Sequence, residues 1–148
     1  MSRSLVIIPT YNEADNITRL LPAVLGQAPN VEVLIVDDNS PDGTAGHVRD
    51  MMSVDSRIHL IERPGKMGLG TAYLEGFKYA IQNGYDYIFE MDADLSHSPK
   101  EIPDFLKKIQ DYDLVIGSRY INGVRVLNWP MRRLVLSFSA NVYTQIIT

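Results

Sequence analysis

The chain has no cysteine among its 148 residues. Disulfide bonds and thiolate metal sites are therefore excluded, and the composition suits a reducing compartment. Long apolar runs are missing too. The run nearest the N-terminus covers only residues 5–8, which is too short for a signal peptide or a membrane span. No other window reaches the roughly 18 apolar residues that a membrane-spanning helix needs, so we expect this stretch of chain to be soluble.

An excess of basic residues is also lacking. Lysine and arginine total 14 against 18 aspartate and glutamate residues, which gives a formal net charge of −4. Nucleic-acid-binding domains usually carry a basic surface, so we expect no nucleic-acid partner. A mildly acidic total still permits a local anion site, because a few arginines can converge on one ligand.

Hydrophobic residues make up 45% of the sequence, enough to form the core of one domain. Short apolar runs predict strands at 5–9, 31–37, 58–62, 87–91 and 114–118. They alternate with patterns that predict helices at 12–25, 44–52, 70–83, 100–109 and 131–148, with Ser98 as an N-cap and Pro99 in the first turn. This alternation is typical of an α/β domain whose mainly parallel sheet is covered by helices on both faces. Ligands of such sheets bind beyond the carboxyl ends of the strands.

Two carboxylates, Asp92 and Asp94, follow the fourth predicted strand. At this spacing they can converge on one hard cation, and oxygen ligands suit Mg2+ or Mn2+. Such a cation would neutralise the charge of a diphosphate leaving group. An acidic loop that caps the helix near Lys100 is an equally good explanation of the pair taken alone.

The second predicted strand ends in two adjacent carboxylates, Asp37 and Asp38. Their charges are costly at the end of a buried strand unless a cation or hydrogen-bond donors lie nearby. Asp42 follows in a segment rich in turn residues, and we interpret it as structural.

The segments after the first and third predicted strands suit nucleotide binding, although each has an ordinary structural explanation. Tyr11 can stack on a base or pack in the core, and Glu13 can accept ribose hydroxyls or favour the first turn of a helix. Lys66, Gly68 and Gly70 are spaced as in a flexible anion-binding loop before a helix.

Several cations occur late in the chain. Arg119 follows the fifth predicted strand, where a guanidinium is costly unless it meets an anion. Trp129, Arg132 and Arg133 fit an ordinary turn and helix start. Because cations at a helix N-terminus oppose its dipole, a ligand for at least one of these arginines is favoured.

The three histidines receive no functional role. His97 is interpreted as a surface residue near a helix cap. His47 and His59 have no partner that the sequence identifies.

Six motifs occur in order along the chain. They are PTYNE (9–13), VDDNSPDGT (36–44), KMGLGTAY (66–73), MDADLSHSP (91–99), GSRY (117–120) and the pair Trp129 and Arg133. Each is weak alone, whereas the ordered set is specific. The set resembles the family 2 glycosyltransferases of the GT-A fold and, within them, the polyprenyl- or dolichyl-phosphate mannose synthases. The resemblance implies a GT-A, Rossmann-like fold.

The resemblance also implies roles for the matching residues. Those that match nucleoside-holding positions are Pro9, Tyr11, Glu13, Val36 and Asp38, with Lys66 in the candidate anion loop. Those that match the metal and diphosphate site are Asp92, Ala93 and Asp94. Arg119 matches a residue facing the sugar and phosphates and Arg133 one near the acceptor phosphate, so Asp94, Arg119 and Arg133 are the expected catalytic residues. Ser96 stands where some members carry glutamine, so its hydroxyl or a water is expected as the third metal ligand.

The implied reaction is inverting transfer of mannose from GDP-mannose to a polyprenyl or dolichyl phosphate, with Mg2+ or Mn2+ as cofactor. A phosphate monoester is already anionic at neutral pH, since its second pKa is about 6, and it needs no strong general base. Family members continue well beyond the equivalent of Thr148. We therefore expect residues 1–148 to be one nucleotide-sugar-binding domain, truncated at the C-terminus and inactive alone.

The implied setting is the cytoplasmic surface of a membrane, where the full-length protein would be peripheral or anchored. The apolar faces of the predicted helix 131–148 are expected to promote self-association of the fragment.

Three alternatives stay open. The first is a related family member that uses another nucleotide sugar, such as a UDP-hexose, or another acceptor. The second is a phospho-receiver domain, suggested by LIVDD at 34–38, although that motif lies on the second predicted strand, and Ser118, Arg119 and Tyr120 stand where a receiver has lysine. The third is a non-catalytic nucleotide-binding homologue, against which the intact Asp92 and Asp94 speak.

Overall fold

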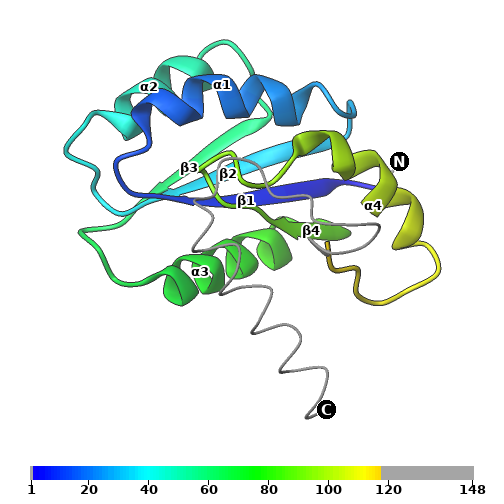
Figure 1. Ribbon diagram of the computed structural model, residues 1–148. Coiled ribbons are helices and arrows are strands. Elements are labelled where there is room, and N and C mark those ends of the chain that lie inside the picture. Colours follow the sequence, from blue (N-terminus) through cyan, green and yellow to red (C-terminus); the bar gives the residue numbers. More distant parts are fainter. Residues whose placement is uncertain (1, 118–148) are drawn as a thin grey trace, which may run out of the picture. The chain divides into compact units, whose positions relative to one another are not determined.

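A computed structural model describes residues 2–117 of the chain (Figure 1). The elements in order are β1 (Ser4–Thr10), α1 (Ala14–Leu25), β2 (Val31–Asp37), α2 (Thr44–Met52), β3 (Ile58–Glu62), α3 (Leu69–Gln82), β4 (Tyr87–Glu90), the short 3-10 helix η1 (Pro99–Glu101) and α4 (Ile102–Lys108). These elements belong to one compact unit, Met1–Asp113. The extension of a single domain to residue 148 stays a prediction.

The sheet of this unit is parallel throughout its described strands. Its order is β3-β2-β1-β4, and each neighbouring pair is parallel. β1 is central, so that Ile7 lies opposite Leu34 on one side and Glu90 on the other. Right-handed crossovers through helices are the usual way to join parallel neighbours, which explains the alternation in the sequence. The prediction of an α/β fold with a mainly parallel sheet is confirmed.

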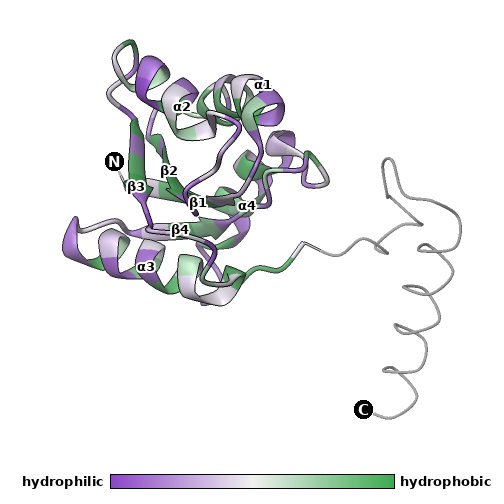
Figure 2. Cartoon of the chain, turned by 90° about the vertical axis from the view of Figure 1, so that its left-hand side faces the viewer, coloured by the Kyte–Doolittle hydropathy of each residue, from purple (hydrophilic) through white to green (hydrophobic). Residues whose placement is uncertain are grey.

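Helices cover both faces of the sheet, as predicted (Figure 1). On β1, Val6 and Ile8 face the layer of α1 and α2, whereas Leu5 and Ile7 face α3. All four of these side chains are fully buried, which gives the strand its continuous apolar sequence. Figure 2 shows the hydrophobic residues concentrated on the strands and on the helix faces turned toward them.

A glycine allows α3 to lie close to the sheet. A Cβ atom at Gly76 would stand 2.5 Å from Cγ2 and 2.8 Å from Cδ1 of Ile7. Ile7 is fully buried in the centre of β1 and cannot easily move away. Gly76 therefore sets the distance between α3 and β1.

One expectation about the later elements is wrong, and another is confirmed with a change of detail. Residues 114–117 form no strand, although 114–118 has an apolar run, because a strand also needs a neighbouring backbone with which to pair. The helix predicted at 100–109 is divided into η1 and α4, and Ser98 stands at the N-cap position without a capping hydrogen bond from its side chain.

Between residues 2 and 117, no helix combines the length and apolar character needed to cross a bilayer. The predicted helix 131–148 lies outside the described residues.

The close approach of α3 predicts that Gly76→Ala destabilises the fold, although alanine is the better helix former. The added methyl group overpacks against Ile7 and should lower the free energy of unfolding by roughly 1–3 kcal/mol. Gly46→Ala, in α2, is the matched control, because nothing lies within 4 Å of its added Cβ. It should raise stability by roughly 0.5–1 kcal/mol. Urea denaturation measures both variants, and equal effects would contradict the packing argument.

Candidate active site

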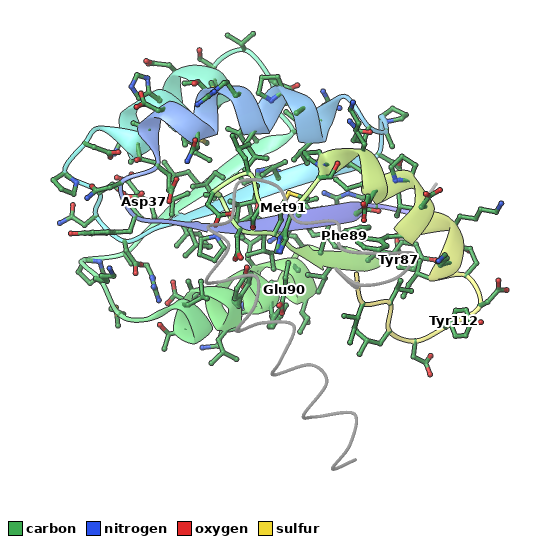
Figure 3. All side chains as sticks on the ribbon, viewed as in Figure 1. Asp37, Tyr87, Phe89, Glu90, Met91 and Tyr112 are labelled. Atoms are coloured by element: carbon green, nitrogen blue, oxygen red, sulfur yellow. The ribbon has the colours of Figure 1, made fainter. Side chains whose placement is uncertain are left out.

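The loops that follow the four strands meet at one edge of the sheet. Because all strands are parallel, the segments after Thr10, Asp37, Glu62 and Glu90 leave the sheet at the same end. In Figure 3, the chain runs from Tyr87 through Phe89 and Glu90 in β4 to Met91 just after it, toward the end of the sheet at which Asp37 lies. This is the edge at which the candidate residues were expected.

Asp37 is held by neutral donors and is fully buried. Thr10 Oγ1 donates to its Oδ1 at 2.8 Å, and the Ser40 hydroxyl donates to the same oxygen at 2.6 Å. The Ser40 backbone N–H donates to Oδ2 at 2.9 Å. These donors replace water around the carboxylate, so its burial needs no cation.

Asp38 instead forms a buried ion pair with Arg63, the residue after β3. Arg63 Nε donates to Asp38 Oδ1 at 2.5 Å, and Nη2 also contacts this oxygen. Arg63 is only 4% exposed and Asp38 only 7%. The backbone N–H of Met67 donates to Asp38 Oδ2 at 3.3 Å. The pair therefore joins the loop after β2 to the loop after β3.

Asp42 joins the starts of two helices, which confirms its structural interpretation. Its Oδ1 accepts hydrogen bonds from the hydroxyl and backbone N–H of Thr44 at 2.6 and 3.0 Å. Its Oδ2 accepts the Ala14 N–H at 3.0 Å. Burial opposes ionisation, but the hydrogen bonds from Thr44 and Ala14 outweigh it and lower the pKa of Asp42. Thr44 Oγ1 also accepts the backbone N–H of Glu13 at 3.0 Å.

The expected nucleoside-binding residues lie along this edge. Tyr11 is exposed, and Lys66 Nζ stands 4.5 Å from the centre of its ring. A contact of this kind brings the loops after β1 and β3 together by cation–π attraction. The Glu13 carboxylate accepts a 2.7 Å hydrogen bond from the Asn16 side chain.

Three other predicted site residues, Pro9, Val36 and Ala93, have apolar side chains that cannot form hydrogen bonds with a ligand. Pro9 and Val36 are partners across β1 and β2, and Val36 is fully buried in the core beneath α3. Ala93 is 4% exposed and packs in the core on the opposite face. Roles for Val36 and Ala93 would depend on their backbone groups.

Asp92 is held from two sides. Tyr73, on α3, donates its hydroxyl to Asp92 Oδ1 at 3.3 Å. The backbone N–H of Asp92 donates to His97 Nδ1 at 3.2 Å, and His97 Nε2 stands 3.9 Å from Asp92 Oδ2. Burial, together with the negative charges of Asp92 and Glu90, raises the pKa of Tyr73 well above its usual range. Tyr73 is therefore a hydrogen-bond donor throughout the physiological pH range.

A tight turn follows Asp92. Leu95 has φ of 60°, a left-handed conformation that costs a non-glycine residue about 1–2 kcal/mol. Its side chain packs against the core, which compensates for part of that cost. The backbone N–H of Ser96 donates to Asp94 Oδ1 at 2.9 Å. The turn thus places Asp94 and Asp92 on one short loop.

The chemistry of this loop suits a hard cation. Asp92 has 42% of its side chain exposed, and Asp94 is exposed as well. Groups of three or more histidine or acidic residues with metal-binding geometry are absent from residues 2–117. Two carboxylates would leave coordination positions for water and phosphate oxygens, as Mg2+ and Mn2+ sites for nucleotides do. Arg119 and Arg133 lie outside the described residues.

The comparison with family models decides the affiliation. The model for glycosyl transferase family 2 matches residues 5–147, almost the whole chain. The chain belongs to glycosyl transferase family 2. This result excludes the phospho-receiver alternative.

Two relatives of this family 2 chain have names that describe lipid-linked mannose transfer. The chain is 47% identical to polyprenol monophosphomannose synthase of Mycolicibacterium smegmatis, over 98% of its own length and 56% of that protein. It is 41% identical to undecaprenyl-phosphate mannosyltransferase of Micrococcus luteus, over 98% of its length and 60% of that protein. The chain thus spans less than two thirds of either relative.

A solved structure with a similar fold is the mannosyltransferase PcManGT from Pyrobaculum calidifontis, in complex with GDP-Man and Mn2+. The TM-score is 0.65 at 28% identity, and the match covers 74% of this chain and 33% of that one. The GT-A affiliation of the fold is therefore confirmed.

The sequence patterns of this family 2 chain did not identify four contacts, which are Tyr73 with Asp92, Arg63 with Asp38, His97 with Asp92 and His59 with Glu32. Tyr73 was part of the KMGLGTAY motif without a role of its own, Arg63 was assigned no role, and His97 was interpreted as a surface residue. The expectation that His59 has no partner is wrong, since its Nε2 lies 2.8 Å from Glu32 Oε2. Glu32 is near the start of β2, so His59 lies away from the candidate site. Each contact joins residues far apart in sequence or in a tight loop, and periodicity does not reveal such pairs.

The buried pair of Asp38 and Arg63 predicts a large effect of removing its positive charge. Arg63→Gln leaves Asp38 uncompensated and should lower the free energy of unfolding by about 3 kcal/mol or more. Arg49→Gln is the matched control, because Arg49 pairs with Glu62 at the surface, where both side chains are exposed. That change should cost no more than about 1 kcal/mol. Thermal and urea unfolding measure the stability of both variants. Similar losses of unfolding free energy would show that the buried pair contributes no more to stability than the surface pair does.

Proposed function

We propose that the protein containing this chain transfers mannose from GDP-mannose to a polyprenyl phosphate. The observation that carries the proposal is the loop with Asp92 and Asp94 at the carboxyl edge of the sheet, the same edge at which the exposed Tyr11 follows β1. This loop occurs in a family 2 chain whose relatives have names describing mannose transfer to lipid phosphates.

The donor would lie across the ends of β1, β2 and β4. Tyr11 would stack on the base, and Glu13 and Asp38 would accept its polar hydrogens or those of the ribose. The carboxylates of Asp92 and Asp94 would hold Mg2+ or Mn2+ with the diphosphate, and Ser96 would add a hydroxyl or a water. When bound, such a cation neutralises the charge that develops on the leaving diphosphate.

The acceptor would be oriented by arginines. Arg119 and Arg133 are proposed to hold the attacking phosphate through charge-assisted hydrogen bonds. The acceptor is already an anion, so the protein has to bring two anions together and needs no strong base. A lipid acceptor would also place the full-length protein at a membrane surface.

Removing one negative charge from the loop that carries Asp92 and Asp94 tests whether nucleotide binding depends on a metal ion. In the wild-type chain, GDP should bind more tightly with Mn2+ than in EDTA. Asp94→Asn preserves the side-chain shape and should weaken the Mn2+-dependent affinity by about tenfold or more, equivalent to at least about 1.4 kcal/mol. Isothermal titration calorimetry measures the affinities. Asp50→Asn, an exposed carboxylate on α2, is the control and should bind as the wild type does. Equal GDP affinity with and without EDTA would refute the metal role.

Competition between donors tests the choice of nucleotide sugar. GDP-mannose should displace a fluorescent GDP analogue from the chain at a lower concentration than UDP-glucose does, because the base contacts are proposed to suit guanine. Mn2+ is kept constant in both titrations. Stronger displacement by UDP-glucose would favour the related-transferase alternative.

A further inference from the structure

Asp92 leaves the sheet at the point where the backbone ladder ends. The last backbone hydrogen bond of this strand joins the Met91 N–H to the Ile7 carbonyl at 3.1 Å. The next N–H, that of Asp92, donates to a side chain, His97 Nδ1, at 3.2 Å. On the other side, the Tyr73 hydroxyl donates to Asp92 Oδ1 at 3.3 Å. Backbone and carboxylate of Asp92 are therefore each held by a separate side chain.

We infer that Tyr73 and His97 are positioning residues that hold Asp92 in the orientation in which it ligates the divalent cation. The inference rests on the proposed metal role of Asp92. It assigns a role to two residues that would not touch the cation themselves and would act on it by orienting Asp92.

Tyr73 is suited to this task because its own position is well fixed. It lies on α3, which packs closely on β1 where Gly76 meets Ile7. Its ring stacks on Phe77, one helical turn later, with 6.4 Å between the ring centres and 25° between the planes. A carboxylate offers about four lone-pair directions, and one hydroxyl donor uses only one of them. The hydroxyl can thus orient Asp92 while leaving capacity for a cation.

His97 fixes the backbone of the same loop. Leu95 adopts the left-handed conformation that reverses the chain, and the imidazole of His97 then returns to the N–H of Asp92. Because Nδ1 is the acceptor, an asparagine at position 97 can replace it with its side-chain oxygen, whereas a phenylalanine cannot.

Binding of Mn2+ alone tests the inference, followed on the full chain by electron paramagnetic resonance of the free ion. Partners that orient a metal ligand typically change metal affinity by about 10–100-fold when removed. Tyr73→Phe should therefore weaken Mn2+ binding by about tenfold. His97→Phe should do the same, and His97→Asn should retain most of the affinity. The control is Tyr79→Phe on the same helix, whose ring lies against His59 and Tyr85 and which should bind Mn2+ as the wild type does.

Thermal unfolding separates positioning from a structural role. In EDTA, Tyr73→Phe should unfold at the wild-type temperature. At a low Mn2+ concentration, the rise in unfolding temperature caused by the metal should be smaller for Tyr73→Phe than for the wild type. It should reach the wild-type value at an Mn2+ concentration about ten times higher, as mass action requires. Wild-type Mn2+ affinity in Tyr73→Phe and His97→Phe would overturn the inference and leave the proposed function intact. So would a lower unfolding temperature in EDTA that excess Mn2+ does not restore. Absence of Mn2+ binding by the wild type would overturn both.

Discussion

β1 is buried on both faces and paired on both edges, so its direction and register constrain every other element of the compact unit. Its side chains alternate between two separate hydrophobic clusters, one beneath α1 and α2 and the other beneath α3. A slip of one residue would exchange the two sets and place Val6 where Ile7 meets Gly76. Because both neighbours run parallel to β1, the same register also brings the ends of β2 and β4 to one edge. The candidate site is a consequence of this packing.

The acidic residues at this edge are stabilised in different ways, and the differences divide their roles. Asp37 is surrounded by hydroxyl and amide donors, and Asp38 is neutralised by Arg63. Neither carboxylate needs a bound metal ion to be stable. Asp92 keeps a large exposed fraction beyond its contact with Tyr73, so a cation at this edge would gain most from the loop after β4. The negative charge that a cation could neutralise at this edge is therefore confined to the loop after β4.

Much of this arrangement could be predicted from the sequence, because apolar runs and helical periodicity carry the information about β1 to β4 and α1 to α3. The same reasoning predicted a strand at 114–118, where the apolar run gives no information about a pairing partner. It also placed Asp92 after its strand correctly but did not identify Tyr73 as its donor, because their contact spans 19 positions and arises only when α3 packs on the sheet. His59 and Glu32 were missed for the same reason, since they lie on neighbouring strands and their side chains meet only in the register that places His59 opposite Leu34. Periodicity describes which face a residue occupies, whereas tertiary packing decides what it meets there.

The first turns of α3 connect the two halves of the candidate site. Arg63 Nη1 donates to Thr71 Oγ1 at 2.7 Å, so the ion pair with Asp38 is tied to the start of this helix. Two residues later, Tyr73 donates to Asp92. Positions two apart on a helix point in different directions, so the same turn can contact the loop after β3 on one side and the loop after β4 on another. A shift of α3 relative to β1 would therefore move the carboxylates of Asp38 and Asp92 together. The absence of a side chain at Gly76, which lets the helix rest on Ile7, therefore bears on the geometry of the loop that carries Asp92 and Asp94 as well as on the stability of the core.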